Sequence, residues 1–150
     1  MDHRTVVVGY DGSDNADRAV EVAADQVRTD GRVHLVTAFH PEPSAELLRR
    51  LEQLPPEYRY SWDPIAAERD RQQAALVHLR GRGVDCTGHV VGDDPATAIL
   101  DVARQEEADL VVVGSRGLGG VQRFVRGSVS SRVASHAPTT VLIVHEPSGS

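Results

Sequence analysis

The chain has 150 residues and an ordinary share of apolar side chains, and we expect residues 1–150 to form a single domain with a sizeable core. Its net charge of −6 argues against binding to nucleic acid, which depends on basic patches. No apolar run approaches the roughly 20 residues of a membrane-spanning helix, and the start of the chain lacks a secretory pattern, so we expect a cytosolic protein that does not bind membranes.

The first half of the chain predicts a strand, a helix and a second strand. Residues 4–10 (RTVVVGY) form a compact β-branched run, which indicates a buried strand. Residues 11–31 predict a turn and then a helix, which Gly31 ends. Its apolar stripe consists of Ala19, Val20, Val22, Ala23 and Val27. Residues 32–39 (RVHLVTAF) predict the second strand.

Residues 40–60 follow no regular pattern. The leucines at 47, 48, 51 and 54 predict a short helix before Pro55 and Pro56. We expect this variable segment to be a mobile or lid-like connection.

The second half of the chain repeats the alternation of helix and strand. Helix 63–83 has Asp63 as its expected N-cap and Pro64 as its first residue. The further predicted elements are strand 84–92, helix 93–108 with an Asp cap, strand 109–114, a helix from about 127 to 136, strand 138–146 and a frayed tail at 147–150.

Five apolar strands separated by helices predict a parallel sheet that is covered on both faces. Right-handed crossovers make such a sheet doubly wound, and ligands bind outside the carboxyl ends of its strands. The first strand ends in GYDGS and the fourth in GSRGLGG. If these strands are neighbours, both loops line one crevice.

The stretch 114–129 (GSRGLGGVQRFVRGSV) is unusually rich in glycine, serine and arginine for a turn. Gly114 and Gly117 allow a ligand to approach the backbone, and Gly127-Ser128 begins a helix whose free N–H groups suit phosphate. Further donors are Ser130, Arg116, Arg123 and Arg126. The alternative is a glycine-rich connection that is only architectural.

Other phosphate and catalytic motifs are absent from the sequence. All 16 basic residues are arginine, so there is no P-loop lysine, and Gln122 interrupts a G-x-G-x-x-G pattern. The 7 histidines show no metal-binding spacing, so we expect surface or strand roles for them and no metal site. No nucleophile has an evident base, and we expect the single cysteine, Cys86, to be a partly buried strand residue.

Asp11, directly after the first strand, has two interpretations. Its carboxylate could bind a ribose hydroxyl, a base or a metal–phosphate unit. Alternatively, Asp11 or Ser13 organises the turn and caps the helix that follows.

The sequence resembles the universal stress protein family, in its single-domain, ATP-binding form. The resemblance covers nearly the whole chain and rests on VVVGYDGSDNADRAVEVA, on GDDPATAILDVARQEEADLVVVGSRGLGG and its continuation, and on the spacing Gly-2x-Gly-9x-Gly-Ser. It implies a five-stranded sheet in the order 3-2-1-4-5, of the adenine-nucleotide alpha-hydrolase-like Rossmann type.

The resemblance also implies an adenine-nucleotide site. Gly114 and Gly117 would face the ribose and phosphates, and Gly127, Ser128 and Val129, joined by Ser130, would hold the phosphates. Asp11 would lie near the adenine or ribose. The remaining implied neighbours are Gly9 and Tyr10 beside Asp11, Ala38 near the base and Val113 near the ribose.

The resulting hypothesis is a cytosolic regulator of the stress response that binds ATP with Mg²⁺ and hydrolyses it slowly or not at all. A cyclic AMP sink or sensor, a true ATPase or nucleotidyl-transfer enzyme, and a nucleotide-free partner-binding module stay open as alternatives. The resemblance further implies a homodimer through the apolar edge strand Thr140–His145, which the chain's own helix or tail could otherwise cover. The protein partner is not identified.

Overall fold

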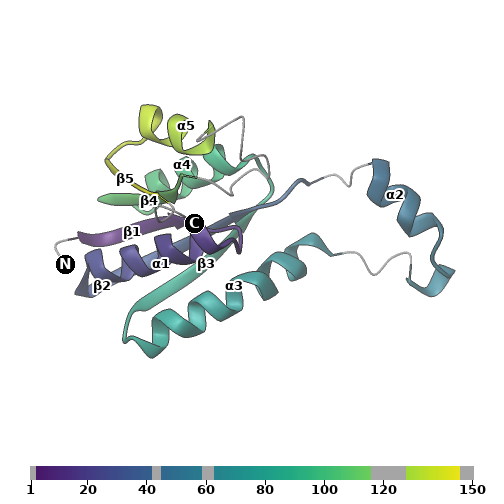
Figure 1. The fold of residues 1–150 in the computed structure, drawn as a ribbon, viewed down its shortest axis with the longest axis horizontal. Coiled ribbons are helices and arrows are strands. Elements are labelled where there is room, and N and C mark those ends of the chain that lie inside the picture. Colours follow the sequence, from purple (N-terminus) through teal and green to yellow (C-terminus); the bar gives the residue numbers. More distant parts are fainter. Residues whose placement is uncertain (1–2, 42–44, 59–62, 116–127, 146–150) are drawn as a thin grey trace.

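A parallel sheet forms the centre of the protein (Figure 1). The computed structural model describes residues 3–41, 45–58, 63–115 and 128–145. The 5 strands are parallel and lie in the order β3-β2-β1-β4-β5, which confirms the expected doubly wound topology. They are β1 (His3–Gly9), β2 (Val27–Ala38), β3 (Asp85–Val91), β4 (Leu110–Gly114) and β5 (Thr140–Val144).

Helices cover both faces of this sheet (Figure 1). The helices are α1 (Asp14–Gln26), α2 (Ala45–Glu52), α3 (Pro64–Gly81), α4 (Pro95–Gln105) and α5 (Ser128–His136), with a 3-10 turn, η1 (Pro56–Tyr58). Alternate residues of β1 point to opposite faces, so Val6 and Val8 pack with α1 and α3 while Val7 packs with α4 and α5. All three valines are fully buried, which makes β1 the centre of both cores.

The helix starts follow the predicted capping chemistry. The side chain of Asp63 accepts a hydrogen bond from the N–H of Ala66 at the start of α3, and Asp94 accepts from Thr97 at the start of α4. Each cap is followed by a proline, which needs no hydrogen-bond acceptor in the first turn. Cys86 lies on β3, as predicted, but it is buried rather than partly buried, and burial raises the pKa of its thiol.

The boundary between α1 and β2 differs from the prediction. The helix ends at Gln26 rather than at Gly31, and Val27 already has the extended backbone of β2. Gly31 lies inside β2, where an added Cβ would stand 2.6 Å from the carbonyl oxygen of Arg4. The glycine therefore permits close strand packing at an irregularity in the pairing of β1 with β2, and it is not a helix stop.

The predicted helix in the 40–60 segment is present as α2. None of its residues is buried, and Leu48 is 47% exposed. Figure 1 shows α2 and η1 at a distance from the sheet, beyond the amino end of α3. Among the described residues, no helix is long and apolar enough to cross a membrane.

Candidate functional site

An open cleft of about 390 Å³ lies at the carboxyl ends of β1 and β2. Its size is within the usual range for small-molecule sites. The first turns of α4 and α5 and the amino-terminal half of α3 complete its walls. The lining residues are Tyr10, Asp11, Val36, Thr37, Ala38, Phe39, His40, Glu68, Arg71, Asp93, Pro95, Ile99, Ser128 and Val129.

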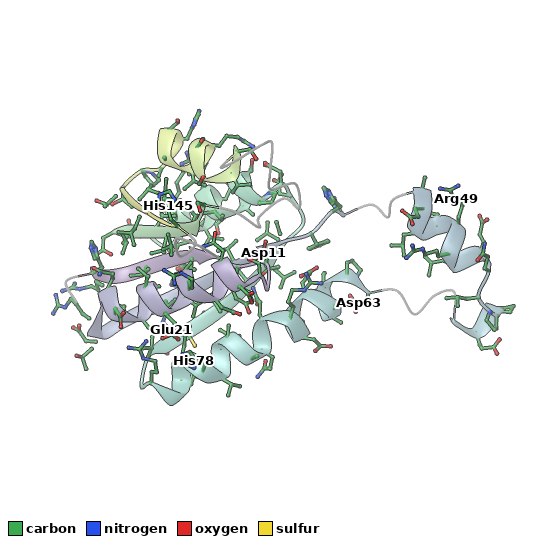
Figure 2. The ribbon with its side chains drawn as sticks, viewed as in Figure 1. Asp11, Glu21, Arg49, Asp63, His78 and His145 are labelled. Carbon is green, nitrogen blue, oxygen red and sulfur yellow. The ribbon has the colours of Figure 1, made fainter. Side chains whose placement is uncertain are left out.

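The turn after β1 is built by short-range hydrogen bonds. The carboxylate of Asp11 accepts from the N–H of Ser13 at 2.9 Å, and the hydroxyl of Ser13 accepts from Ala16 as the N-cap of α1. Gly12 adopts a φ of +83°, which a side chain would strain, and the stem of Arg71 lies over it. Asp11 thus organises the turn and lines the cleft at the same time, so its two interpretations are compatible (Figure 2).

A buried polar network fixes the position of this turn. The hydroxyl of Thr37 donates to the carbonyl oxygen of Tyr10 at 2.8 Å and accepts from the Gln72 amide at 2.7 Å. The same amide nitrogen donates to the carbonyl of His89 at 2.9 Å. The network therefore ties the end of β1 to β2, β3 and α3.

The side chain of Tyr10 is fixed by contacts within the fold, although Tyr10 also lines the cleft. Its hydroxyl donates to the carboxylate of Asp17 on α1 at 2.8 Å, and its ring belongs to the core beneath α1 and α3. Burial and the neighbouring Asp17 raise the pKa of this phenol far above its usual range. The neutral phenol thus supports the turn as a fixed part of the core.

The structure brings several of the predicted site residues together. The cleft is lined by five of them, namely Tyr10, Asp11, Ala38, Ser128 and Val129. The others in the described chain are buried and do not line the cleft, namely Gly9, Val113, Gly114 and Ser130. Arg116, Gly117 and Gly127, together with Arg123 and Arg126, lie outside the described residues.

Gly114 has a packing role that the sequence did not indicate. An added Cβ there would stand 2.7 Å from the side-chain oxygen of Asn15. Asn15 is buried on α1, and its amide donates to the carbonyl of Val144 at 3.1 Å. Because Gly114 has no side chain, α1 can approach the ends of β4 and β5.

Sequence reasoning missed the contributions of α3 and of the loop after β2. Arg71 is the only arginine among the described lining residues, and its guanidinium contacts the carbonyl of Asp11 and the carboxylate of Glu68. Phe39 supplies an aromatic wall, with its ring packed over Gly92. These residues belong to no local motif, and only strand order and helix packing bring them to the cleft.

The described walls suit a base and a ribose. Val36, Ala38, Ile99 and Val129 provide apolar surface, and Asp11 and Asp93 provide carboxylates that accept hydrogen bonds from hydroxyl groups. The amino end of α5 adds the partial positive charge of a helix start on the side of Ser128. Within the described residues the cleft thus pairs apolar and acidic walls with one anion-attracting helix end.

Comparison with known proteins gives consistent matches over nearly the whole chain. The model of the universal stress protein family matches residues 3–145. A universal stress protein of Thermus aquaticus is 36% identical over 94% of this chain and 98% of its own length. A universal stress protein of Mycobacterium tuberculosis (strain H37Rv) is 32% identical over 95% of this chain and 97% of its own length. A crystal structure of a universal stress protein in complex with cAMP is 30% identical, with a TM-score of 0.69 over 95% of this chain and 97% of that one.

Proposed function

The chain belongs to the universal stress protein family, and from this premise we propose that it binds an adenine nucleotide in the cleft between the turn after β1 and the start of α5. The proposed ligand is ATP with Mg²⁺, and the proposed role is a cytosolic regulator of the stress response with little or no hydrolysis. The observation that carries the proposal is that one cleft is lined by Asp11, by Ala38 and by the adjacent residues Ser128 and Val129, three places that are distant in sequence.

The proposed orientation follows from the chemistry of the walls. The base packs against Ala38 and its apolar neighbours, and Asp11 accepts a hydrogen bond from the ribose or the base. The phosphates lie toward the amino end of α5, where the positive end of the helix dipole and the hydroxyl of Ser128, which lines the cleft, suit an anion. The further residues predicted to contact the phosphates are Gly114, Arg116, Gly117, Gly127 and Ser130.

A cyclic AMP sink or sensor is the second candidate function. The universal stress protein solved in complex with cAMP is 30% identical to this chain over nearly its whole length, which favours this alternative specifically. Both ligands share adenine, ribose and phosphate, so the same walls suit either. The ratio of their affinities decides between the two roles.

The proposal also includes a homodimer through Thr140–His145. β5 lies at the edge of the sheet, and Ile143 on it is 36% exposed. An apolar edge strand offers unpaired backbone groups to a second copy of itself. Antiparallel pairing of two such edges would cover both.

The test is calorimetric titration of nucleotide-free protein with Mg-ATP, ADP, cyclic AMP and adenosine. We predict that Ser128→Asp weakens ATP binding by at least tenfold and leaves adenosine binding nearly unchanged. A unit charge about 4 Å from a phosphate costs about 1–4 kcal/mol, depending on the local dielectric, and 1.4 kcal/mol corresponds to about tenfold in affinity. An acid at the start of a helix is compatible with folding, so the variant isolates the effect on the ligand.

Ser131→Asp is the matched control. Ser131 is an exposed serine of the same helix that does not line the cleft. Equal ATP affinity in the Ser128→Asp and Ser131→Asp proteins would contradict the placement of phosphates at α5. Folded wild-type protein that binds none of the nucleotides would favour the partner-binding module, and a preference for cyclic AMP over ATP would favour the sink or sensor.

A further inference from the structure

Two histidines of neighbouring strands meet on the sheet face that α4 covers. His34 lies on β2 and His89 on β3, and the strand register pairs His34 with Thr87 and Val36 with His89. The two histidines are thus two positions apart in register and point to the same face. Nδ1 of His34 and Nε2 of His89 are 2.9 Å apart, with ring centroids at 5.1 Å. Sequence spacing did not reveal this pair, because 55 positions separate its members.

A carboxylate reaches the same place from the end of α4. Glu106 is the C-cap of α4, and the following residue, Glu107, adopts a left-handed φ of 52°. The N–H of Ala108 donates to the carbonyl of Ala103, and that of Glu107 to Arg104, which is the Schellman pattern of helix ends. These two hydrogen bonds fix the backbone at Glu106. Its carboxylate and the ligand nitrogens of His34 and His89 all lie within 4.8 Å of one another.

Burial favours the neutral form of both imidazoles, although the carboxylate of Glu106 opposes this effect. Burial lowers the pKa of both rings, and the adjacent His89 lowers that of His34 further. Neutral imidazole nitrogen is the form that coordinates transition metals, whereas the protonated ring does not.

Solvent reaches the group from one side. A hollow of about 490 Å³ borders His34 and Glu106 and shares no lining residue with the nucleotide cleft. The guanidinium of Arg32, at its rim, is paired with Asp85 at 2.6 Å and donates to Thr87. The charge of this cation is therefore largely compensated near the histidines.

We propose that His34, His89 and Glu106 form a binding site for a divalent transition-metal ion of the zinc class, separate from the nucleotide cleft. Two imidazoles and one carboxylate are a ligand set that zinc accepts, with water from the adjoining hollow as a fourth ligand. Zinc–nitrogen bonds of about 2.0–2.1 Å in tetrahedral geometry place two ligand nitrogens about 3.3 Å apart. The two nitrogens therefore need to move apart by only a few tenths of an ångström, with both rings turned so that their lone pairs face the ion. The proton of the hydrogen bond between them moves to the other nitrogen of its ring, and the exposed Glu106 closes the site from its own side.

The test titrates tag-free, metal-stripped protein with Zn²⁺ by calorimetry and with Co²⁺ by visible absorption, which reports the coordination of the ion. We expect one ion per chain in the wild type. His89→Gln and Glu106→Gln should each weaken binding by at least tenfold, since loss of even an outer partner of a metal ligand costs about 10- to 100-fold. Glu106 is exposed, so Glu106→Gln retains the fold and keeps the test valid if His89→Gln is unstable.

His78→Gln is the matched control. His78 on α3 also contacts a carboxylate, that of Glu21 on α1, but lies outside the proposed site (Figure 2). Its loss should leave Zn²⁺ affinity and the Co²⁺ spectrum unchanged. The proposal is overturned if the wild type binds no stoichiometric Zn²⁺, or if Glu106→Gln binds it as tightly as the wild type. It is equally overturned if His78→Gln lowers the affinity as much as the site variants do.

Discussion

Replacement of Gln72 by methionine should destabilise the protein because it removes the donor at the centre of the buried network. Gln72 is 2% exposed, and its amide nitrogen donates to Thr37 at 2.7 Å and to the His89 carbonyl at 2.9 Å. Two such bonds contribute about 1–3 kcal/mol together, and the partly buried His89 carbonyl that loses this donor adds to the loss. Methionine has a similar length and no donor, so we expect the free energy of unfolding to fall by about 2–4 kcal/mol.

Urea unfolding at neutral pH measures this loss, and Thr37→Val completes a double-mutant cycle. Thr37 shares one hydrogen bond with Gln72 and donates another to Tyr10, so the two substitutions should be non-additive by about 1 kcal/mol. Gln72→Met should also weaken nucleotide binding, because the Tyr10 carbonyl and the turn after it lose their support. A loss below about 0.5 kcal/mol, or strict additivity with Thr37→Val, would refute the reasoning that this network holds the turn.

Two further predictions concern the start of α4 and the sheet edge. Asp94→Ala should lower the free energy of unfolding by about 1 kcal/mol at pH 7 through loss of the N-cap, and Asp94→Asn by less. Burial opposes the charge of Asp94, but hydrogen bonds from Thr97 and Arg132 outweigh it and hold the carboxyl pKa below its usual 3.8. The stabilising effect of the charge is therefore fully present above pH 3.8 and is lost as the pH falls through the lower pKa of the folded state. Urea unfolding should show that the difference in unfolding free energy between wild type and Asp94→Ala narrows only below about pH 4. Ile143→Lys should leave the fold intact and convert a dimer into a monomer in analytical ultracentrifugation, whereas a wild type that is monomeric at high concentration would exclude the edge-strand dimer.

Local chemistry made the helix starts and the strands predictable. Asp63 and Asp94 each precede a proline and a helical apolar stripe, and both cap as expected. The strand order came from the family resemblance, since alternation alone predicts a parallel sheet without its order. Gly31 shows the limit of local patterns, because a glycine that ends a helix looks the same as one that admits a neighbouring backbone.

The candidate site was predictable only where residues lie next to strand ends. Ala38 ends β2 and Asp11 lies two residues beyond the end of β1, so the topology places both at the cleft. Arg71 and Gln72 lie in the middle of α3, and their roles depend on how this helix packs across β2 and β3. The meeting of His34 with His89 depends on strand register, which composition and spacing do not encode.

The position of β1 has a consequence for hydrogen exchange. Val6, Val7 and Val8 are fully buried, and their strand is paired with β2 on one side and β4 on the other. Amides in such a strand exchange with solvent only through global unfolding. The turn that carries Asp11 leaves directly from this strand, so a ligand meets a wall that is already formed. A ligand at 100 times its Kd stabilises the folded chain by about 2.7 kcal/mol, which corresponds to about a hundredfold in the unfolding equilibrium. Amide exchange at these three valines should slow by about the same factor, so their exchange rates report how much of the protein has ligand bound in the cleft.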